Sequence, residues 1–599
     1  MTTTLFRAGT SSAPESTVDE ARFLDEALRL YRSMRCARAI DEIERELIAR
    51  GEAFFHVSGA GHEATAALAK HLRDGDFLHC HYRDKALLLA RGVPVGAFFD
   101  NLLCNADSQS AGRQMSAHLS VPTLNVLSIV GPVGNNALQA AGIAHEIKAR
   151  ESRPIVLCSL GDGMSQQGEV LEAIAEAVRW RLPVLFLIED NSYAISTRTA
   201  GKTFYSTPDG DLETFCGLAI HRIDGSDPIA CDEAFGALVG AIRDTRGPAL
   251  CVMKVARLSD HTNADDETVY RTPDELRRIR ATADPIAELR ARLLSAGVEE
   301  RKIAALESAV AVEVRAAAEQ ALEHPAPRAM PDAKAPLGDE LTRREHECRG
   351  PEGDASSAMA AALRNCLAVN MRADPRITLY GEDIEDPKGD VFGLARGLAD
   401  EFPGRVGNSP LSEATIMGVS IGRALAGGRP VAFIQFADFL PLAFNQLACE
   451  LASLDWRTDG GWRTPVVVLA SCGAYRPGLG PFHAGSAEAL VAHVPGLDVA
   501  LPSTAVDAAG MLNAAFRSQR PTVVLYPKAL LNDAGRGGPA TVSDLLVPVG
   551  TARKVREGDA LTLVAWGNTV PLCERAAEAL AEAGVAAEVI DLRWISPWD

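Results

Sequence analysis

Apolar runs and amphipathic helical patterns alternate through the first half of the chain. The strand-like runs lie at 155–160, 184–188 and 248–255. The helical patterns lie at 20–50, 60–73, 165–180, 231–244, 273–296 and 299–323. Strands that alternate with helices are typical of a parallel sheet covered by helices on both faces. We therefore expect residues 21–323 to form an α/β domain.

The pattern changes at His324. Residues 324–354 hold five prolines and many charged side chains without an apolar period, which is typical of a linker. The alternation of strands and helices then restarts over 355–545. Strands are expected at 376–380, 430–435, 465–470 and 522–526, and helices at 357–371, 413–425 and 505–517. The sequence therefore predicts a second doubly wound domain.

A third unit occupies residues 550–599. It contains strand-like runs at 560–565 and 586–591 around a helical pattern at 570–584. A helix-covered parallel sheet needs more strands and helices than these, so we expect this domain to be incomplete. Residues 1–20 lack an apolar core of signal-peptide length and are expected to be a short disordered lead-in.

The composition narrows the class of protein. The net charge of the 599 residues is −19, which disfavours nucleic acid and anionic membrane surfaces as partners. No apolar run approaches the roughly 20 residues that span a bilayer. The twelve cysteines include no C-x-x-C pair, which suits a reducing compartment. We therefore expect a globular protein of the cytoplasm.

Two neighbouring strands end in acidic and amide side chains. One apolar run stops at the turn Gly161-Asp162-Gly163, and the next stops just before Asn191. A glycine-rich turn lets the backbone approach an anion, and the following helix offers its positive N-terminus. The Asp162 carboxylate and the Asn191 carbonyl suit Mg²⁺ or Ca²⁺, and Mg²⁺ is usually shared with phosphates. Two unrelated capped turns would look the same, but their spacing across one strand–helix–strand unit favours a metal site.

Several motifs resemble one known family. A GDG followed by 27 residues and an asparagine is the thiamin-diphosphate motif. The segments YRDKALLLARGVP, GRQMSAH, GPVGNNALQAAG, EDNSYAIST and RLSDHTNADDETVYR resemble the α subunit of the decarboxylating component of 2-oxoacid dehydrogenases, above all the branched-chain type. The segments YGEDIEDPKGDVFG, SPLSEATIMGVSIGRALAG, FIQFADFLPLAFNQL, GPFHAGSAEALVAHVPGL and PSTAVDAAGML resemble the β subunit. The resemblance covers about residues 22–320 and 357–599, so the chain looks like an α–β fusion.

The resemblance implies a thiamin-diphosphate-binding fold. This fold would comprise two doubly wound parallel-sheet domains and a partial domain like the C-terminal domain of transketolase. Thiamin diphosphate and Mg²⁺ would be the cofactors. The metal would be held by Asp162, Asn191 and the backbone carbonyl of Tyr193, as in the family.

The resemblance also implies contacts to the cofactor itself. The matching positions are Tyr82, Arg83, Gly131, Val133, Gly161, Gly163, Met164, Leu411 and Phe439. A fixed guanidinium at Arg83 suits a diphosphate. The alternative is that Tyr82 and Arg83 are surface residues of an exposed turn. Val133 matches a branched side chain beneath the cofactor, whereas Leu411 and Phe439 match positions that pack on the pyrimidine ring and could equally be core.

Three residues match catalytic positions of the family. Glu413 matches the carboxylate that hydrogen-bonds the pyrimidine ring nitrogen, although spacing alone would place it in the acidic first turn of a helix. His261 matches the α-subunit histidine that orients the diphosphate. His483 matches the β-subunit histidine proposed as a proton donor in transfer to the lipoyl group. His118 is a weaker candidate near the substrate.

The implied reaction is the oxidative decarboxylation of a 2-oxo acid. A branched-chain acid is favoured, and pyruvate or acetoin is left open. The acyl unit would pass to a lipoyl group of a partner acyltransferase, and the fusion is expected to form at least a homodimer. Three alternatives stay open: a transketolase-like enzyme, an acyl-forming enzyme that does not use lipoate, and an inactive scaffold.

Overall fold

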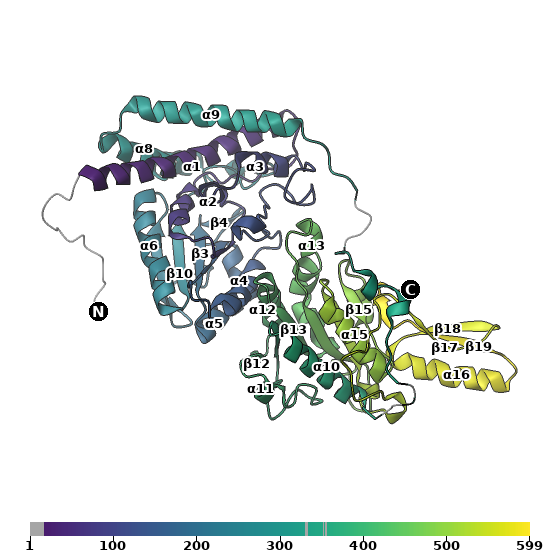
Figure 1. The fold of residues 1–599 in the computed structure, drawn as a ribbon. Coiled ribbons are helices and arrows are strands. Elements are labelled where there is room, and N and C mark those ends of the chain that lie inside the picture. Colours follow the sequence, from purple (N-terminus) through teal and green to yellow (C-terminus); the bar gives the residue numbers. More distant parts are fainter. Residues whose placement is uncertain (1–16, 330–333, 352, 354–355) are drawn as a thin grey trace.

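The computed structural model describes residues 17–329, 334–351, 353 and 356–599. Figure 1 shows an N-terminal and a C-terminal lobe that meet at helices α4 (Asn136–Ile147), α5 (Gly168–Trp180) and α12 (Glu413–Leu425). Residues 1–16 of the predicted lead-in lie outside the described residues. Helix α1 already begins at Thr17 and runs to Ala49, so the lead-in is shorter than expected.

The N-terminal lobe is built on a six-stranded sheet with the order β1-β2-β3-β10-β9-β8. The first five strands are parallel, and only β8 pairs antiparallel. The strands are β1 (Phe77–His79), β2 (Val156–Gly161), β3 (Val184–Asp190), β8 (Thr214–Phe215), β9 (Leu218–Asp224) and β10 (Ala249–Lys254). The predicted α/β class with a parallel sheet is confirmed.

Alternate side chains of the central strands point to opposite faces of the sheet and pack into two different hydrophobic cores. Cys158 and Phe186 belong to the cluster with α4, α5 and α12, whereas Leu157 and Leu185 belong to a cluster on the opposite face. That second face is covered by α1, α6 (Pro228–Thr245) and α9 (Glu300–Leu322). Burial on both faces explains why β2 and β3 read as continuous apolar runs.

Two helical predictions of this lobe differ from the structure. The pattern at 60–73 forms a 3₁₀ segment, Glu63–His71, and the pattern at 273–296 forms two helices, α7 (Pro273–Thr282) and α8 (Pro285–Ser295). The second break lies at Asp284, whose side chain accepts a hydrogen bond from the backbone N–H of Ile286. Proline at the first position of α8 supplies no N–H to continue α7, so a new helix starts there.

The C-terminal lobe contains a seven-stranded sheet with the order β12-β11-β13-β14-β16-β15-β20. Helices α10 (Met359–Ala373) and α15 (Ala505–Arg517) pack on one face, and α12 packs on the other. The strands are β11 (Ile377–Gly381), β12 (Val406–Asn408), β13 (Arg429–Phe436), β14 (Val467–Cys472), β15 (Asp498–Ala500), β16 (Thr522–Pro527) and β20 (Trp594–Ser596).

The third unit is joined to this second sheet. It contains a three-stranded sheet of β17 (Arg553–Arg556), β19 (Ala587–Asp591) and β18 (Leu561–Ala565), with α16 (Val570–Glu582) on one face. Its last strand, β20, leaves that sheet and pairs antiparallel with β15. The segment that was predicted as a separate domain therefore returns to the second domain.

Short elements complete the two lobes. The short helices are α2 (Lys85–Ala90), α3 (Val95–Leu102), α11 (Leu398–Glu401), α13 (Leu454–Arg457) and α14 (Glu488–Ala492). The two-residue strands are β4 (Tyr193–Ala194), β5 (Thr197–Arg198), β6 (Ser206–Thr207) and β7 (Gly210–Asp211).

The described part of the segment 324–354 contains two 3₁₀ turns and a single β-bridge between Cys348 and Leu546, and it is anchored to the C-terminal lobe. The Lys334 ammonium lies 2.9 Å from an Asp498 carboxylate oxygen. The Glu347 carboxylate pairs with the fully buried Arg593 guanidinium at 2.6 Å, and Arg593 also lies 3.4 Å from Asp507. Buried charges of opposite sign thus tie this segment to the last turn before β20.

Glycines let the two lobes approach backbone to backbone. A Cβ atom added at Gly142 in α4 would lie 2.1 Å from the Val419 carbonyl oxygen in α12. A Cβ atom added at Gly422 in α12 would lie 2.0 Å from the Gln139 carbonyl oxygen in α4. Because neither position has room for a methyl group, glycine at both sets the distance between the helices.

None of the helices in the described part of the chain combines the length and apolar character that crossing a bilayer requires.

We predict that Gly422→Ala destabilises the protein by about 3 kcal/mol, because the new methyl group would force α4 and α12 apart. Gly240→Ala is the matched control, since Gly240 lies inside helix α6 with no atom within 4 Å of an added Cβ. The control should be neutral or up to about 1 kcal/mol more stable. Differential scanning calorimetry would measure both, and equal melting temperatures would contradict the close approach.

Candidate active site

Polar residues gather where four adjacent strands of the first sheet end. His81 to Lys85 follow β1, the Gly161-Asp162-Gly163 turn closes β2, Asn191 follows β3, and His261 lies in the loop after β10. These strands are parallel neighbours, so their carboxyl ends lie along one edge. Such an edge is where doubly wound sheets bind ligands.

Asp162 and Asn191 provide buried oxygen atoms at this edge. The Thr199 hydroxyl donates to an Asp162 carboxylate oxygen at 2.6 Å, and the Asn191 side-chain oxygen accepts from the Tyr193 N–H at 3.1 Å. Burial raises the pKa of Asp162. A buried carboxylate beside an amide carbonyl is a donor set that fits Mg²⁺, because a cation would stabilise the ionised form.

Arg83 is a buried cation at the same edge. One of its guanidinium nitrogens lies 3.0 Å from Nδ1 of His261 and 3.3 Å from the His261 carbonyl oxygen. Among the described residues no carboxylate forms an ion pair with Arg83, and burial lowers the pKa of its guanidinium. A buried, uncompensated guanidinium fits an anionic group such as a diphosphate.

The contact with Arg83 fixes the tautomer of His261. Arg83 can only donate, so Nδ1 of His261 must accept, and the neutral ring carries its proton on Nε2. Burial, followed by the charges of Arg83 and Arg257, lowers the pKa of His261 to about 4. At neutral pH His261 is therefore an uncharged donor.

Tyr82 lies between two histidines. Its ring stacks on His118 with centroids 6.1 Å apart and meets His261 edge-on at 6.4 Å. Nδ1 of His118 lies 2.9 Å from the Ser116 carbonyl oxygen, so this ring donates from Nδ1 and offers Nε2 as an acceptor. The two histidines thus present opposite hydrogen-bonding groups.

The sequence analysis missed four buried polar residues at this edge: His62, His81, Asp84 and Glu189. Nδ1 of His62 lies 2.5 Å from a Glu189 carboxylate oxygen, and burial raises the pKa of Glu189 to about 7. A signal was present, because His81 and Asp84 flank Tyr82-Arg83 and Glu189 lies in the last two residues of β3, just before Asn191.

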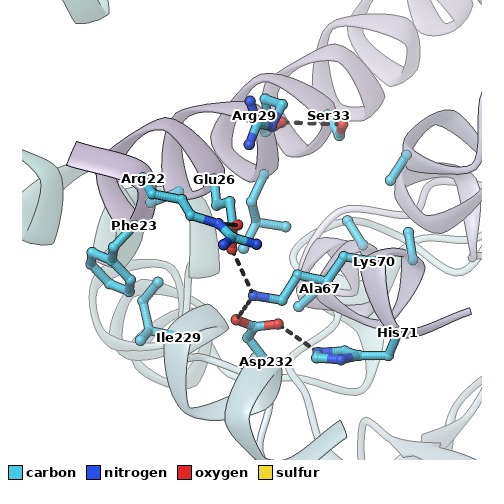
Figure 2. Close-up of a pocket in the computed structure, with 15 residues that line it drawn as sticks. Arg22, Phe23, Glu26, Arg29, Ser33, Ala67, Lys70, His71, Ile229 and Asp232 are labelled. Carbon is cyan, nitrogen blue, oxygen red and sulfur yellow. Dashed lines mark hydrogen bonds and ion pairs between the residues drawn. The ribbon is translucent and has the colours of Figure 1, made fainter. Parts of the chain in front are cut away.

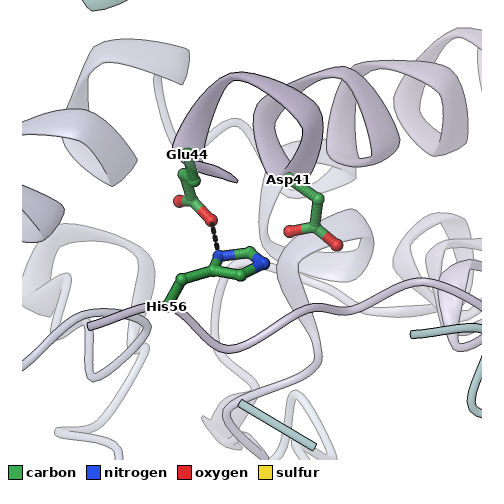
Figure 3. Close-up of side chains that lie close together, drawn as sticks. All are labelled: Asp41, Glu44 and His56. Atoms are coloured by element: carbon green, nitrogen blue, oxygen red, sulfur yellow. Dashed lines mark hydrogen bonds and ion pairs between the residues drawn. The ribbon is translucent and has the colours of Figure 1, made fainter. Parts of the chain in front are cut away.

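Asp41, Glu44 and His56 lie close together in a buried cluster (Figure 3). Asp41 and Glu44 come from α1, and His56 from the loop that follows it. The Lys85 ammonium lies 2.5 Å from a carboxylate oxygen of each acid. Three such side chains could hold a metal ion, but the ammonium already takes the place of the cation. The cluster is therefore structural, and the Lys85 ammonium supplies its positive charge.

This cluster orients the two loops that carry Arg83 and His261. Asp41 accepts hydrogen bonds from the Ser58 hydroxyl and the Gly59 N–H, both at 2.7 Å, and the Ser58 carbonyl accepts from Arg83. The His56 N–H donates to the Asn263 side chain at 2.9 Å. The Lys85 cluster consequently supports both partners of the Arg83–His261 contact.

Glu413 is the first residue of α12 and is nearly buried. Burial raises its pKa. The hydroxyls of Ser412 and Thr415 donate to Glu172 of α5 at 2.8 and 2.9 Å. Because Glu172 is ten residues after Asp162, these bonds bring the start of α12 to the helix that follows the GDG turn.

Two other predicted residues of the second half, Phe439 and His483, form an aromatic group with Phe436. The exposed His483 ring lies 4.9 Å from Phe436 and 5.8 Å from Phe439. Phe439 and Val133 both pack against the core cluster that includes Met164. Leu411 is 83% exposed and therefore makes little contact with the rest of the chain.

The remaining predicted residues keep to the first lobe. Gly131 is exposed in the turn before α4, and Gly163 would place a Cβ atom 2.7 Å from the Ala194 side chain. The structure thus brings Tyr82, Arg83, Asp162, Asn191 and His261 to one sheet edge, whereas no described contact places Gly131 or Val133 there. No described contact joins His483 to His261.

A cavity of about 520 Å³ lies away from this edge (Figure 2). Its lining comes from α1, the 3₁₀ segment 63–71 and α6. Lys70 bridges Glu26 at 3.2 Å and Asp232 at 2.5 Å across it. The cavity contains none of the predicted site residues, so we do not assign it to the active site.

We predict that Lys85→Met destabilises the protein by about 3 kcal/mol, because two buried carboxylates lose their cation. It should also shift the ¹³Cε1 NMR resonance of His261, since both supporting loops loosen. Arg243→Met is the matched control, because Arg243 forms another buried pair with Asp76 at 2.6 Å in the same lobe. An equal loss of stability with an unmoved His261 resonance is expected there, and the same result for Lys85→Met would contradict the positioning role.

We predict that Arg83→Met raises the pKa of His261 from about 4 toward its ordinary value of 6.5, because a neighbouring positive charge is removed. The rise should be partial, since burial also lowers this pKa. A pH titration of the histidine ¹³Cε1 resonances would measure it. Arg257→Met should give a smaller rise, and an unchanged pKa in Arg83→Met would exclude the contact.

Comparisons with known proteins match both halves of the chain to described families. Residues 31–330 match the family model described as "Dehydrogenase E1 component". Residues 355–533 match "Transketolase, pyrimidine binding domain", and residues 550–599 match "Transketolase, C-terminal domain".

Three relatives illustrate the similarity. The chain is 38% identical over 239 residues to 2-oxoisovalerate dehydrogenase subunit beta of Bacillus subtilis, covering 40% of this chain and 72% of that protein. It is 39% identical over 248 residues to pyruvate dehydrogenase E1 component subunit beta of Leifsonia xyli, covering 41% and 71%. It is 35% identical over 257 residues to acetoin:2,6-dichlorophenolindophenol oxidoreductase subunit beta of Cupriavidus necator, covering 40% and 75%. These matches show that the chain belongs to the E1 family of thiamin-diphosphate-dependent 2-oxoacid dehydrogenases, with an α-like half followed by a β-like half in one polypeptide.

Proposed function

We propose that the protein decarboxylates a small 2-oxo acid with thiamin diphosphate and Mg²⁺ and passes the acyl unit to a lipoyl group of a partner acyltransferase. The observation that carries this proposal is the buried Arg83–His261 pair. It offers a positive charge and a neutral donor at the sheet edge that also carries the Asp162 carboxylate. An anion bound through a divalent cation satisfies all three groups.

The first lobe would hold the charged end of the cofactor. Asp162, Asn191 and the Tyr193 carbonyl would bind Mg²⁺, while Arg83 neutralises the diphosphate. His261 would donate its Nε2–H to the bound anion. Thiamin diphosphate, when bound, supplies the electron sink that allows a 2-oxo acid to lose CO₂.

The second half would act on the other end of the cofactor. Burial raises the pKa of Glu413, so its carboxyl group holds a proton more readily than an exposed one, as a partner of a ring nitrogen must. Its neighbours Ser412 and Thr415 bond to α5 of the same chain. We therefore infer that both halves of one chain contribute to one site.

His483 suits a later proton transfer. It lies in an exposed aromatic group, where a long acceptor arm can reach it. An imidazole in such a position can give up a proton when the acyl unit leaves. We place the lipoyl group on this side of the site and expect the protein to act as a homodimer.

The branched-chain 2-oxo acid is the preferred substrate, because the motifs around Arg113 and His261 resemble that type and a 2-oxoisovalerate enzyme is among the relatives. Pyruvate is the nearest alternative for the same chemistry. Acetoin is a second candidate, which the Cupriavidus relative favours.

We predict that the protein binds thiamin diphosphate only with Mg²⁺ and that Asp162→Ala weakens the binding at least about a hundredfold, since a metal ligand is lost. Isothermal titration calorimetry would measure the dissociation constant. Asp224→Ala is the control, because Asp224 is exposed at the end of β9 and is not part of the predicted set. No binding by the folded protein would refute the proposal.

The same preparation would identify the substrate. Release of CO₂ from 2-oxoisovalerate and pyruvate, and release of acetaldehyde from acetoin, would be measured with an artificial electron acceptor and with a free lipoyl domain. Acyl transfer to the lipoyl domain is expected. Turnover with the artificial acceptor alone would favour the acyl-forming enzyme without lipoate.

A further inference from the structure

His81 is a buried histidine that lacks hydrogen-bond partners. Its side chain is almost completely buried, and neither ring nitrogen has a partner among the described residues. Its neighbours differ, because His62, His118 and His261 each have one ring nitrogen in a hydrogen bond. A buried polar group without a partner is costly, so this ring is built to meet a ligand.

The position of the ring points to the GDG turn. His81 is the second residue after β1, which pairs with β2. A Cβ atom added at Gly161, the first residue of the turn, would lie 3.2 Å from Nε2 of His81. The backbone of Gly161 does not require glycine for its conformation, since its φ lies outside the left-handed region. A side chain at this position would press on the imidazole, so glycine leaves room for the ring.

The carboxylate of Asp84 bonds to the backbone of His81 and not to its ring. Asp84 accepts a hydrogen bond from the backbone N–H of His81 at 2.8 Å, and this leaves the ring nitrogens available. Arg83 and the rings of His62 and Tyr82 surround the site, with centroids 6.4 and 4.0 Å from the His81 ring. These surroundings favour an incoming anion over a cation.

We propose that His81 is a further ligand of the cofactor's diphosphate, donating a ring N–H to a diphosphate oxygen beside the turn at Gly161. The inference rests on the proposed function, since it names a contact for the same cofactor. Arg83 supplies the charge, and His81 supplies a directed hydrogen bond from the β1 side. Gly161 leaves the space in which the imidazole and the anion meet.

The test compares three variants by isothermal titration calorimetry with Mg²⁺–thiamin diphosphate and with Mg²⁺–pyrophosphate. His81→Leu removes the donor at similar size, and His81→Gln keeps an N–H donor. His145→Leu is the control, because His145 is another nearly buried histidine of this lobe that pairs with Glu176 and lies on α4. We expect about a tenfold loss of affinity for both ligands in His81→Leu and less than about a threefold loss in His81→Gln and His145→Leu.

Wild-type affinity in a folded His81→Leu variant would overturn the inference. If that variant does not fold, ¹³Cε1 spectra of the wild-type protein decide. The resonance missing from His81→Gln should move when Mg²⁺–pyrophosphate is added, and an unmoved resonance would also overturn it. The proposed function fails separately, when the wild-type protein does not bind thiamin diphosphate at all.

Discussion

The backbone contact between α4 and α12 is the constraint on which the rest of the molecule depends. Because Gly142 and Gly422 lack side chains, a backbone carbonyl oxygen of the facing helix occupies the space beside each of them. Val133 lies three residues before α4, and Glu413 is the first residue of α12. The distance between the helices therefore sets the distance between the two predicted positions that face the cofactor ring. A rigid contact of this kind suits a site whose groups come from different lobes.

Buried charge is handled in two ways within one lobe. Lys85 is matched by two carboxylates and fixes the loops around it. Arg83 is equally buried, yet its contacts are carbonyl oxygens and an imidazole. The compensated cation stabilises the fold, whereas the uncompensated one is held ready for an anion. This difference separates structural from functional charge without reference to any motif.

Strand ends were the part of the site that the sequence could predict. Asp162 and Asn191 follow apolar runs that are buried on both faces, and parallel strands bring such ends together. His81 and the Lys85 cluster could not be found this way, because their meaning depends on contacts with Gly161 and with α1, 80 and 44 positions away. The break at Asp284 follows from a local capping signal, Asp284 before a proline. The prediction of one helix over 273–296 gave more weight to the continuous helical period than to that signal. The return of β20 to the second sheet depends on long-range pairing, which no local pattern specifies.

The pairing of β20 with β15 has a consequence for biosynthesis. The second sheet gains its edge strand only when β20 has left the ribosome, and Arg593 then meets Glu347, which lies 246 residues earlier in the chain. Closing so long a loop is slow compared with local helix formation. The first lobe, whose strands and covering helices lie within residues 17–322, can fold much earlier during translation. The nascent chain would thus carry a finished N-terminal lobe, with α4 awaiting α12, while the C-terminal lobe is still being made.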